Sequence, residues 1–297
     1  MLTTIAFADQ LQYSPPFQYK GAYTMNMFHA AFLGAIQGFA EVLPISSSAH
    51  LILIPWLLKW PESGLTFDVA LHLGTFLALS LYFWRDIVEM TVSFFDAIVA
   101  RRLNTPARKL PFLIIAATVP AAVVGKLFED QIEAIFRSNP LLIASVLVGF
   151  ALLLGLSDQL GRKRLTVEEI TPVSAITIGL MQCLALIPGV SRSGITITAA
   201  LTLGFTRESA ARFSFLLSLP IVAGAALLKT VHLLKHGIPT GEGLPMLVGI
   251  IFSAVAGYIS VAFLLRFVQK QTLSPFVWYR VIVGGGLIVA LMTGYKG

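Results

Sequence analysis

The sequence predicts an all-α polytopic membrane protein with six transmembrane helices and two re-entrant helical hairpins in an inverted-topology repeat. Of its 297 residues, 56% are hydrophobic and only 12% are charged, whereas about 25% are charged in a typical soluble domain. Several apolar runs are long enough for the roughly 20 residues that cross a bilayer core. They lack the alternating polarity of barrel strands. Soluble enzymes, disordered chains and porins are therefore excluded.

Six apolar windows predict full membrane crossings, because each is free of charge apart from Arg280 in the last. They are Val69 to Trp84, Leu110 to Gly125, Pro140 to Leu156, Phe213 to Leu228, Leu244 to Leu265 and Phe276 to Met292. Two further apolar stretches, Asn26 to Leu58 and Ile170 to Thr206, are interrupted by proline and serine. Each predicts two short helices joined by a polar break.

The two broken stretches resemble each other, which indicates an internal repeat. Three residues match at an offset of 145, and two more match after a slip of one residue. The pairs are Gly34 with Gly179, Gln37 with Gln182, Ala40 with Ala185, Pro44 with Pro188 and Ser47 with Ser191. Three predicted crossings separate the stretches, so they enter from opposite sides, as in many transporters. We expect an N-terminal extension (1–26) and one membrane domain (27–297), with repeats at 27–156 and 170–295.

The distribution of Lys and Arg predicts the orientation. If the loop from Arg85 to Lys109 is cytoplasmic, the loops on that side hold twelve basic residues against seven on the other, in agreement with the positive-inside rule. Both termini then lie outside. The net charge of +6 follows from these loops, and no basic cluster is interleaved with aromatic residues. We therefore expect no nucleic acid partner.

Ionisable residues within membrane segments are costly and are functional candidates. Here they are Glu41, His50, His72, Arg192 and Arg280, with His29 near the start of the first hairpin. Glu41 and Arg192 lie at or beside the two breaks, so we expect them to share one site. A lone histidine on an apolar face is more often a packing residue, which is what we expect of His72 and His29.

Both breaks offer serine-rich helix N-termini, whose free N–H groups and dipole favour an anion. Arg192 adds a bidentate donor suited to phosphate. The predicted phosphate ligands are Ser46, Ser48, Ser191, Arg192, Ser193 and Gly194. Ordinary N-capping is the alternative for any single serine.

Ser47 and His50 are three residues apart, so they are neighbours on one helical face. We expect His50 to activate Ser47 as a nucleophile, and Glu41 to hold a divalent cation against phosphate oxygens. Gln37, four residues before Glu41, lies on the same helical face.

The run from Gln37 to Leu51, QGFAEVLPISSSAHL, together with PGVSRSG at Pro188 to Gly194, resembles the undecaprenyl-diphosphate phosphatase family associated with bacitracin resistance. The resemblance extends over nearly everything after residue 26. It implies an enzyme of the bacterial inner membrane that hydrolyses undecaprenyl diphosphate and so recycles the lipid carrier for peptidoglycan synthesis.

The resemblance also implies roles for individual residues. Glu41 is implied to be catalytic or metal-binding, Ser47 to be the nucleophile and His50 to be the acid/base, while Arg192 and Ser191 bind phosphate. It further implies dependence on Mg²⁺ or Ca²⁺, for which Gln37 is a weaker ligand than the Glu found in many members. The expected partners are a polyprenyl diphosphate lipid and the membrane, and a homodimer is compatible with the sequence. We expect the active site to open to the periplasmic side.

A polyprenyl-phosphate flippase is the alternative function, since inverted repeats and a phosphate site also suit transport. An ion channel is a weaker alternative, because no ring of like charges appears.

Overall fold

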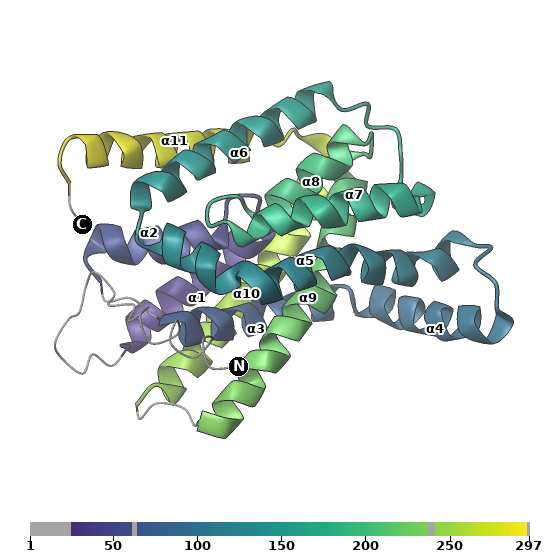
Figure 1. Cartoon of the computed structure of the whole chain (residues 1–297), viewed down its shortest axis with the longest axis horizontal. Helices are drawn as coiled ribbons and strands as arrows, with labels where there is room; N and C mark the ends of the chain where they lie inside the picture. Colours follow the sequence, from purple (N-terminus) through teal and green to yellow (C-terminus); the bar gives the residue numbers. More distant parts are fainter. Residues whose placement is uncertain (1–24, 61–63, 237–240, 296–297) are drawn as a thin grey trace, which may run out of the picture.

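The computed structural model describes residues 25–60, 64–236 and 241–295, and the regular structure within these ranges is helical. Eleven α-helices and two short 3₁₀ helices follow one another in the described ranges (Figure 1). They are α1 (Met27–Val42), α2 (Ser47–Leu58), α3 (Gly64–Tyr82), α4 (Trp84–Ala100), α5 (Pro106–Arg137), α6 (Pro140–Leu160), η1 (Val167–Glu169), α7 (Pro172–Gln182), η2 (Cys183–Leu186), α8 (Arg192–Thr202), α9 (Arg207–His236), α10 (Gly243–Lys270) and α11 (Ser274–Met292). The expected N-terminal extension lies almost entirely outside the described residues, and α1 begins at Met27 with Asn26 as its N-cap.

Five of the described helices, α5, α6, α9, α10 and α11, are long and apolar enough to cross a membrane, as five of the six windows predicted. The sixth window falls in α3, which meets that test only together with α4, and the two helices are bent by 76°. The loop predicted from Arg85 to Lys109 is wrong between Arg85 and Ala100, because these residues form α4.

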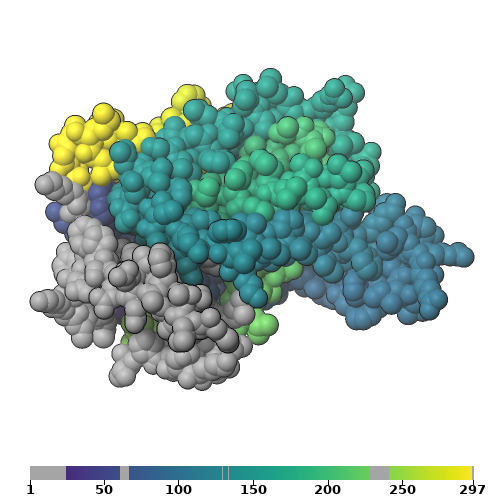
Figure 2. Space-filling model, in the orientation of Figure 1, coloured from purple at the N-terminus to yellow at the C-terminus, as the bar shows by residue number. Residues whose placement is uncertain are grey.

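The α4 helix is missed by a search for charge-free windows because it is amphipathic. Val88, Val92 and Phe95 are exposed along one stripe, whereas Asp86 and Asp96 form ion pairs with arginines of other helices. Such a helix suits the membrane interface. In Figure 2, α4 projects from the body of the molecule together with the start of α5.

The outer surface of the long helices is apolar. Large hydrophobic side chains are half exposed or more on each of them, among them Val123 on α5, Leu152 on α6, Val255 on α10 and Ile282 on α11. A soluble protein rarely exposes contiguous apolar surface on this scale. Together with the five apolar helices, this surface identifies a multi-pass membrane protein.

Close helix packing depends on glycines at matching positions of the two broken stretches. A Cβ on Gly34 of α1 would lie 2.3 Å from the carbonyl oxygen of Gly249 in α10, and a Cβ on Gly179 of α7 would lie 2.3 Å from that of Ala117 in α5. Small residues at such contacts allow helix backbones in membranes to approach closely. The matching glycines therefore seat the first helix of each broken stretch against a long helix.

The two breaks have the same local geometry. Ser46 caps α2 and Ser191 caps α8, with φ values of 78° and 73°, a region that residues other than glycine rarely occupy. Each cap hydroxyl accepts a hydrogen bond from the backbone N–H three residues later, at 3.4 Å from Ala49 and 3.1 Å from Gly194. Ser191 is therefore the structural counterpart of Ser46.

The one-residue slip expected between Ser47 and Ser191 is accordingly wrong. The offset of 145 that relates Gln37 to Gln182 continues through the breaks, so that Ser47 corresponds to Arg192. The serine-rich sequence on both sides of the caps allowed either alignment, and only the backbone angles distinguish them.

Arg280 of α11 joins the two breaks at the centre of the molecule. It is fully buried, and its guanidinium donates to the carbonyl oxygens of Gly189 at 2.8 Å, Val190 at 3.1 Å and Pro44 at 3.4 Å. Its Nε also donates to the carbonyl oxygen of Leu147 in α6. The bonds to Gly189, Val190 and Pro44 satisfy carbonyl groups that a helix break leaves without intrahelical partners.

Candidate functional site

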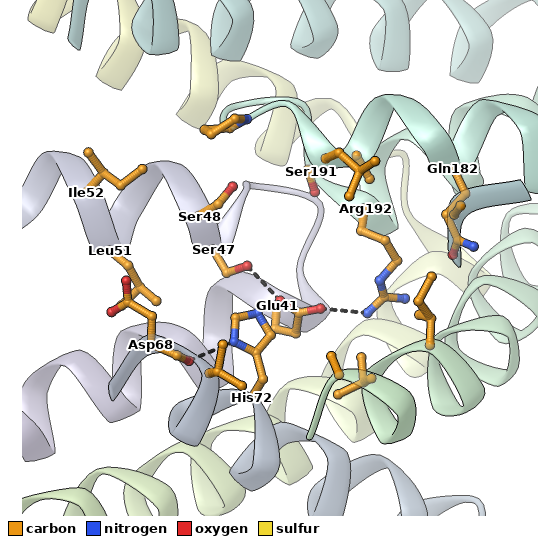
Figure 3. A pocket seen from close by; sticks show the side chains of 18 of the residues that line it. Glu41, Ser47, Ser48, Leu51, Ile52, Asp68, His72, Gln182, Ser191 and Arg192 are labelled. Atoms are coloured by element: carbon orange, nitrogen blue, oxygen red, sulfur yellow. Dashed lines mark hydrogen bonds and ion pairs between the residues drawn. The ribbon is translucent and has the colours of Figure 1, made fainter. Parts of the chain in front are cut away.

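A cavity of about 300 Å³ lies between the two breaks and is lined by five of the predicted site residues, Glu41, Ser47, Ser48, Ser191 and Arg192 (Figure 3). Its polar lining comes from both broken stretches and from α3 and α5. These residues are Glu41, Ser47, Ser48, Asp68, His72, Arg137, Gln182, Ser191 and Arg192. The rest of the lining is mainly aliphatic, including Leu51, Ile52 and Val222.

Glu41 is the centre of the hydrogen-bond network in this cavity. It lies in the last turn of α1 and is 7% exposed. Ser47 donates to its Oε2 at 2.6 Å, and Arg192 donates to its Oε1 at 2.8 Å. Gln37 also donates to Oε2, at 3.3 Å. The expected pairing of Glu41 with Arg192 is confirmed, and the carboxylate joins the two broken stretches.

Arg192 is also held in place by a contact with α9. It begins α8, and its Nη1 donates to the carbonyl oxygen of Ser214 in α9 at 3.1 Å. The guanidinium has five N–H donors, and within the described part of the chain only Ser214 and Glu41 accept from it. Its remaining donors are available to an anion in the cavity.

His72 of α3 also lines the cavity, next to Glu41. The Nε2 atom of His72 lies 3.4 Å from Glu41 Oε2, and its Nδ1 atom is hydrogen-bonded to the carbonyl oxygen of Asp68 at 2.8 Å. The expectation that His72 is a packing residue is wrong. Asp68 in turn forms an ion pair with Arg137 at 3.3 Å. The cavity thus has a second arginine, at the far end of α5.

The predicted phosphate ligands divide into two groups. Ser48, Ser191 and Arg192 line the cavity. Ser46 and Ser193 are each 1% exposed and do not line it; Ser193 donates to the carbonyl oxygen of Leu43 instead. The backbone N–H of Gly194 donates to the Ser191 hydroxyl. Ser46, Ser193 and Gly194 therefore stabilise the backbone of the two breaks and do not line the cavity.

His50 does not lie beside Ser47, so the expected contact is wrong. Its Nδ1 is hydrogen-bonded to the carbonyl oxygen of Ser46 at 2.7 Å and its Nε2 to the hydroxyl of Tyr279 at 2.8 Å. It lines a separate, mainly apolar cavity of about 350 Å³ between α2, α6 and α11. The α2 helix separates the two cavities, so a spacing of three residues did not bring the side chains together.

The side-chain oxygen atoms of Glu41 and Gln37 are of the type that a hard divalent cation prefers as ligands. The side-chain oxygen of Gln37 is buried and has no hydrogen-bond partner among the described residues, and it belongs to the amide that donates to Glu41. No three His, Cys, Asp or Glu side chains in the described ranges gather closely enough to hold a metal ion. Most of the ligands of a cation here would come from substrate and water, as is common for Mg²⁺.

Sequence reasoning missed Asp68, Arg137 and Gln182 as cavity residues. Asp68 and His72 are four residues apart, the same spacing as Gln37 and Glu41, and this second polar pair in an apolar stretch was the available signal. Arg137 follows a long helix and gave no signal. Gln182 was visible only as the repeat counterpart of Gln37.

The fold and the cavity together define a class of protein, a helical membrane protein with a buried carboxylate, serine and arginine site suited to phosphate chemistry. The model of the family described as Bacitracin resistance protein BacA matches residues 30–286. The chain belongs to this family.

Curated relatives cover the chain at high identity. An undecaprenyl-diphosphatase of Pelobacter propionicus is 68% identical over 273 residues, which are 92% of this chain and 100% of the relative. One of Geobacter metallireducens is 63% identical over 91% of the chain and 100% of the relative. One of Thermomicrobium roseum is 41% identical over 91% of the chain and 99% of the relative.

Proposed function

We infer that the chain is an integral membrane phosphatase that hydrolyses undecaprenyl diphosphate to undecaprenyl phosphate and inorganic phosphate. Its relatives carry the name undecaprenyl-diphosphatase, and the chain belongs to the bacitracin resistance family. The reaction returns the lipid carrier to peptidoglycan synthesis and accounts for bacitracin resistance.

One observation carries the mechanism. Ser47 donates to Glu41 at 2.6 Å, while Arg192 binds the other carboxylate oxygen at 2.8 Å. A serine hydroxyl is a weak nucleophile until a base accepts its proton. Glu41 is the base in contact with it, and Arg192 is the donor suited to stabilise charge on a phosphate.

The reaction proceeds in two steps on this arrangement. The Ser47 oxygen forms a bond to the terminal phosphorus, its proton passes to Glu41, and the bond to the bridging oxygen breaks, so that undecaprenyl phosphate leaves. Glu41 gives this proton to the departing bridging oxygen. Water then attacks the phosphoserine, its proton passes through Glu41 to the Ser47 oxygen, and the bond between that oxygen and phosphorus breaks, which releases inorganic phosphate and restores the hydroxyl. Arg192, Ser191 and Ser48 bind the phosphate oxygens. His50 supports the backbone of the first break through Ser46.

A divalent cation, Mg²⁺ or Ca²⁺, is part of this proposal. Glu41 would hold it with the side-chain oxygen of Gln37 as a further ligand, and it would neutralise charge on the diphosphate. The buried oxygen of Gln37 without a partner supports this assignment.

The flippase alternative has less support. A carrier would use Arg192 and the helix ends to bind phosphate, but it has no use for a serine that donates to a buried carboxylate. Hydrolysis uses all three groups.

The proposed topology has six crossings, of which α3 bends by 76° into the interfacial helix α4. The α1–α2 and α7–α8 pairs are re-entrant hairpins of an inverted repeat. The matched caps and glycines of the two hairpins support it. The membrane is the bacterial inner membrane. Arg137 supports a cavity that opens to the periplasm, because it lines the cavity at the end of α5 opposite the basic segment 101–109.

Phosphate release from undecaprenyl diphosphate by the purified protein tests the function. We expect release that is lost with a chelator and restored by Mg²⁺ or Ca²⁺. Arg192→Lys should lose about 100-fold in kcat/KM, since lysine lacks the planar fork. No release by well-folded wild-type protein would contradict the function, and release unaffected by chelator would contradict the cation.

Thiol labelling tests the orientation in a Cys183→Ser background. In intact cells an impermeant reagent should label Ser138→Cys but not Leu103→Cys, and both residues are exposed. The opposite pattern would reverse the topology.

A further inference from the structure

Gln182 is a buried amide in the cavity wall whose side chain lacks a partner. It ends α7 at the point where the chain continues as 3₁₀ helix, and it is 1% exposed. Neither its Nε2 nor its Oε1 has a hydrogen-bond partner among the described residues. It lines the same cavity as Glu41 and Arg192, and Figure 3 shows it beside Arg192 on the side of the cavity away from Ser47.

A buried amide with no partner is unfavourable for the fold alone. Most buried polar side-chain atoms are hydrogen-bonded, and a donor or acceptor without a partner loses its interaction with water and gains nothing in return. A methionine or leucine of similar size would fill this position without that loss. The position therefore points to a ligand that supplies both an acceptor and a donor when it enters the cavity.

The counterpart of Gln182 in the first repeat has a different environment. Gln37 is equally buried, but its Nε2 donates to Glu41 four residues later. Four residues after Gln182, the second repeat has Leu186. Gln182 therefore lacks the carboxylate partner that Gln37 has one turn later, and it lines the cavity beside Arg192.

We propose that Gln182 is a substrate-contacting residue whose amide N–H groups donate to an oxygen of the phosphate that Arg192 binds. The amide oxygen accepts a hydrogen bond from the water that hydrolysis consumes. This inference rests on the proposed function and adds a ligand from the second repeat to it.

An amide suits this position better than a charged group. A carboxylate would repel the phosphate and compete with it for Arg192, whereas a second cation would compete for Glu41. An amide donates and accepts without charge, so it can bind a phosphate oxygen and a water molecule and leave the ion pair of Glu41 and Arg192 undisturbed.

The test compares Gln182→Met with Gln269→Met in the purified full-length protein. Gln269 is exposed at the end of α10 and donates to Glu208, so the same chemical change is made far from the cavity. For each protein, turnover of undecaprenyl diphosphate, inhibition by inorganic phosphate and the Tm in detergent are measured.

We expect Gln182→Met to lose about 10- to 100-fold in kcat/KM, the effect expected of a hydrogen bond to a charged group. Its inhibition constant for inorganic phosphate should rise at least threefold, while its Tm stays equal to the wild-type value or rises. Gln269→Met should match the wild type in turnover and inhibition. Gln182→Glu should be the weaker enzyme of the two variants at position 182, because its carboxylate repels phosphate.

Two outcomes would overturn the inference. In one, Gln182→Met has wild-type turnover and phosphate inhibition. In the other, its activity falls in proportion to a lower Tm while Gln182→Glu retains activity and phosphate affinity, which would make the amide structural. Wild-type protein and Gln269→Met that both fail to release phosphate would instead contradict the proposed function.

Discussion

The two breaks share a backbone and differ in chemistry. Both have a capping serine with positive φ, and both are held by hydrogen bonds from Arg280. At matching positions, however, the first break has Glu41 and Ser47 where the second has Leu186 and Arg192. Ser47 and Arg192 thus begin their helices at equivalent places and bind the two oxygens of one carboxylate.

This difference indicates how a repeated scaffold can make an asymmetric site. Each break aims the first residue of a helix at a shared cavity, and the nature of that residue decides its role. In the proposed mechanism, the first broken stretch supplies a nucleophile and a base, whereas the second supplies phosphate ligands. Neither repeat has the full set of groups, so the site depends on the contact between them.

The largest effect is expected when Glu41 is changed. Glu41→Gln removes the acceptor of the Ser47 proton and the counter-ion of Arg192, so turnover should fall by about 1000-fold or more, since loss of a general base alone commonly costs about 100- to 10,000-fold. Steady-state phosphate release measures it. Leu186→Met, at the matching position in the second repeat, is the control and should stay within about threefold. Turnover above a hundredth of wild type in Glu41→Gln would assign Glu41 a structural role.

The next largest effect is expected for Arg280→Met, which should destabilise both breaks at once. It leaves the carbonyl oxygens of Gly189, Val190 and Pro44 without their present donor, and each buried group that loses its partner costs about 1–3 kcal/mol. We expect the unfolding free energy in detergent to fall by about 3 kcal/mol or more. Arg266→Met, at an exposed residue of α10, should change it by less than about 0.5 kcal/mol. Equal effects of the two changes would show that Arg280 does not hold the breaks.

The smallest effects are expected for the capping serines Ser46 and Ser191, which should differ only in their effect on KM. Ser46→Ala and Ser191→Ala should each lower the unfolding free energy by about 1 kcal/mol, because each removes one N-cap. Only Ser191 lines the cavity, so only its substitution should raise KM, by about three- to tenfold. Measured KM and unfolding curves for both variants check this, and equal KM values would limit Ser191 to capping.

Much of this arrangement could be predicted from the sequence, because membrane segments obey a strong rule. A charge-free apolar run must be helical to satisfy its backbone in lipid, which located α5, α6, α9, α10 and α11. Proline and serine within apolar runs located both breaks. The cost of buried charge predicted that Glu41 and Arg192 would meet.

The remainder depended on directions in space that spacing does not determine. Ser47 and His50 lie on neighbouring positions of α2, yet their side chains enter different cavities. His72 approaches Glu41 from another helix, and the spacing of residues along α3 does not reveal that contact. The amphipathic α4 carries charges, so a search for charge-free windows passed over it.

We propose that Glu41 of the first broken stretch activates Ser47 to attack a phosphate held by Arg192 of the second. Rapid acid quench of the enzyme during turnover, followed by peptide analysis, tests it most directly. We expect a phosphoserine at position 47 in wild type, none in Ser47→Ala, and a Ser47→Ala turnover reduced by at least about 1000-fold, a loss of about 4 kcal/mol. A Ser47→Ala protein that retains more than about a tenth of wild-type turnover, a loss under about 1.4 kcal/mol, would assign the attack to water and contradict the account.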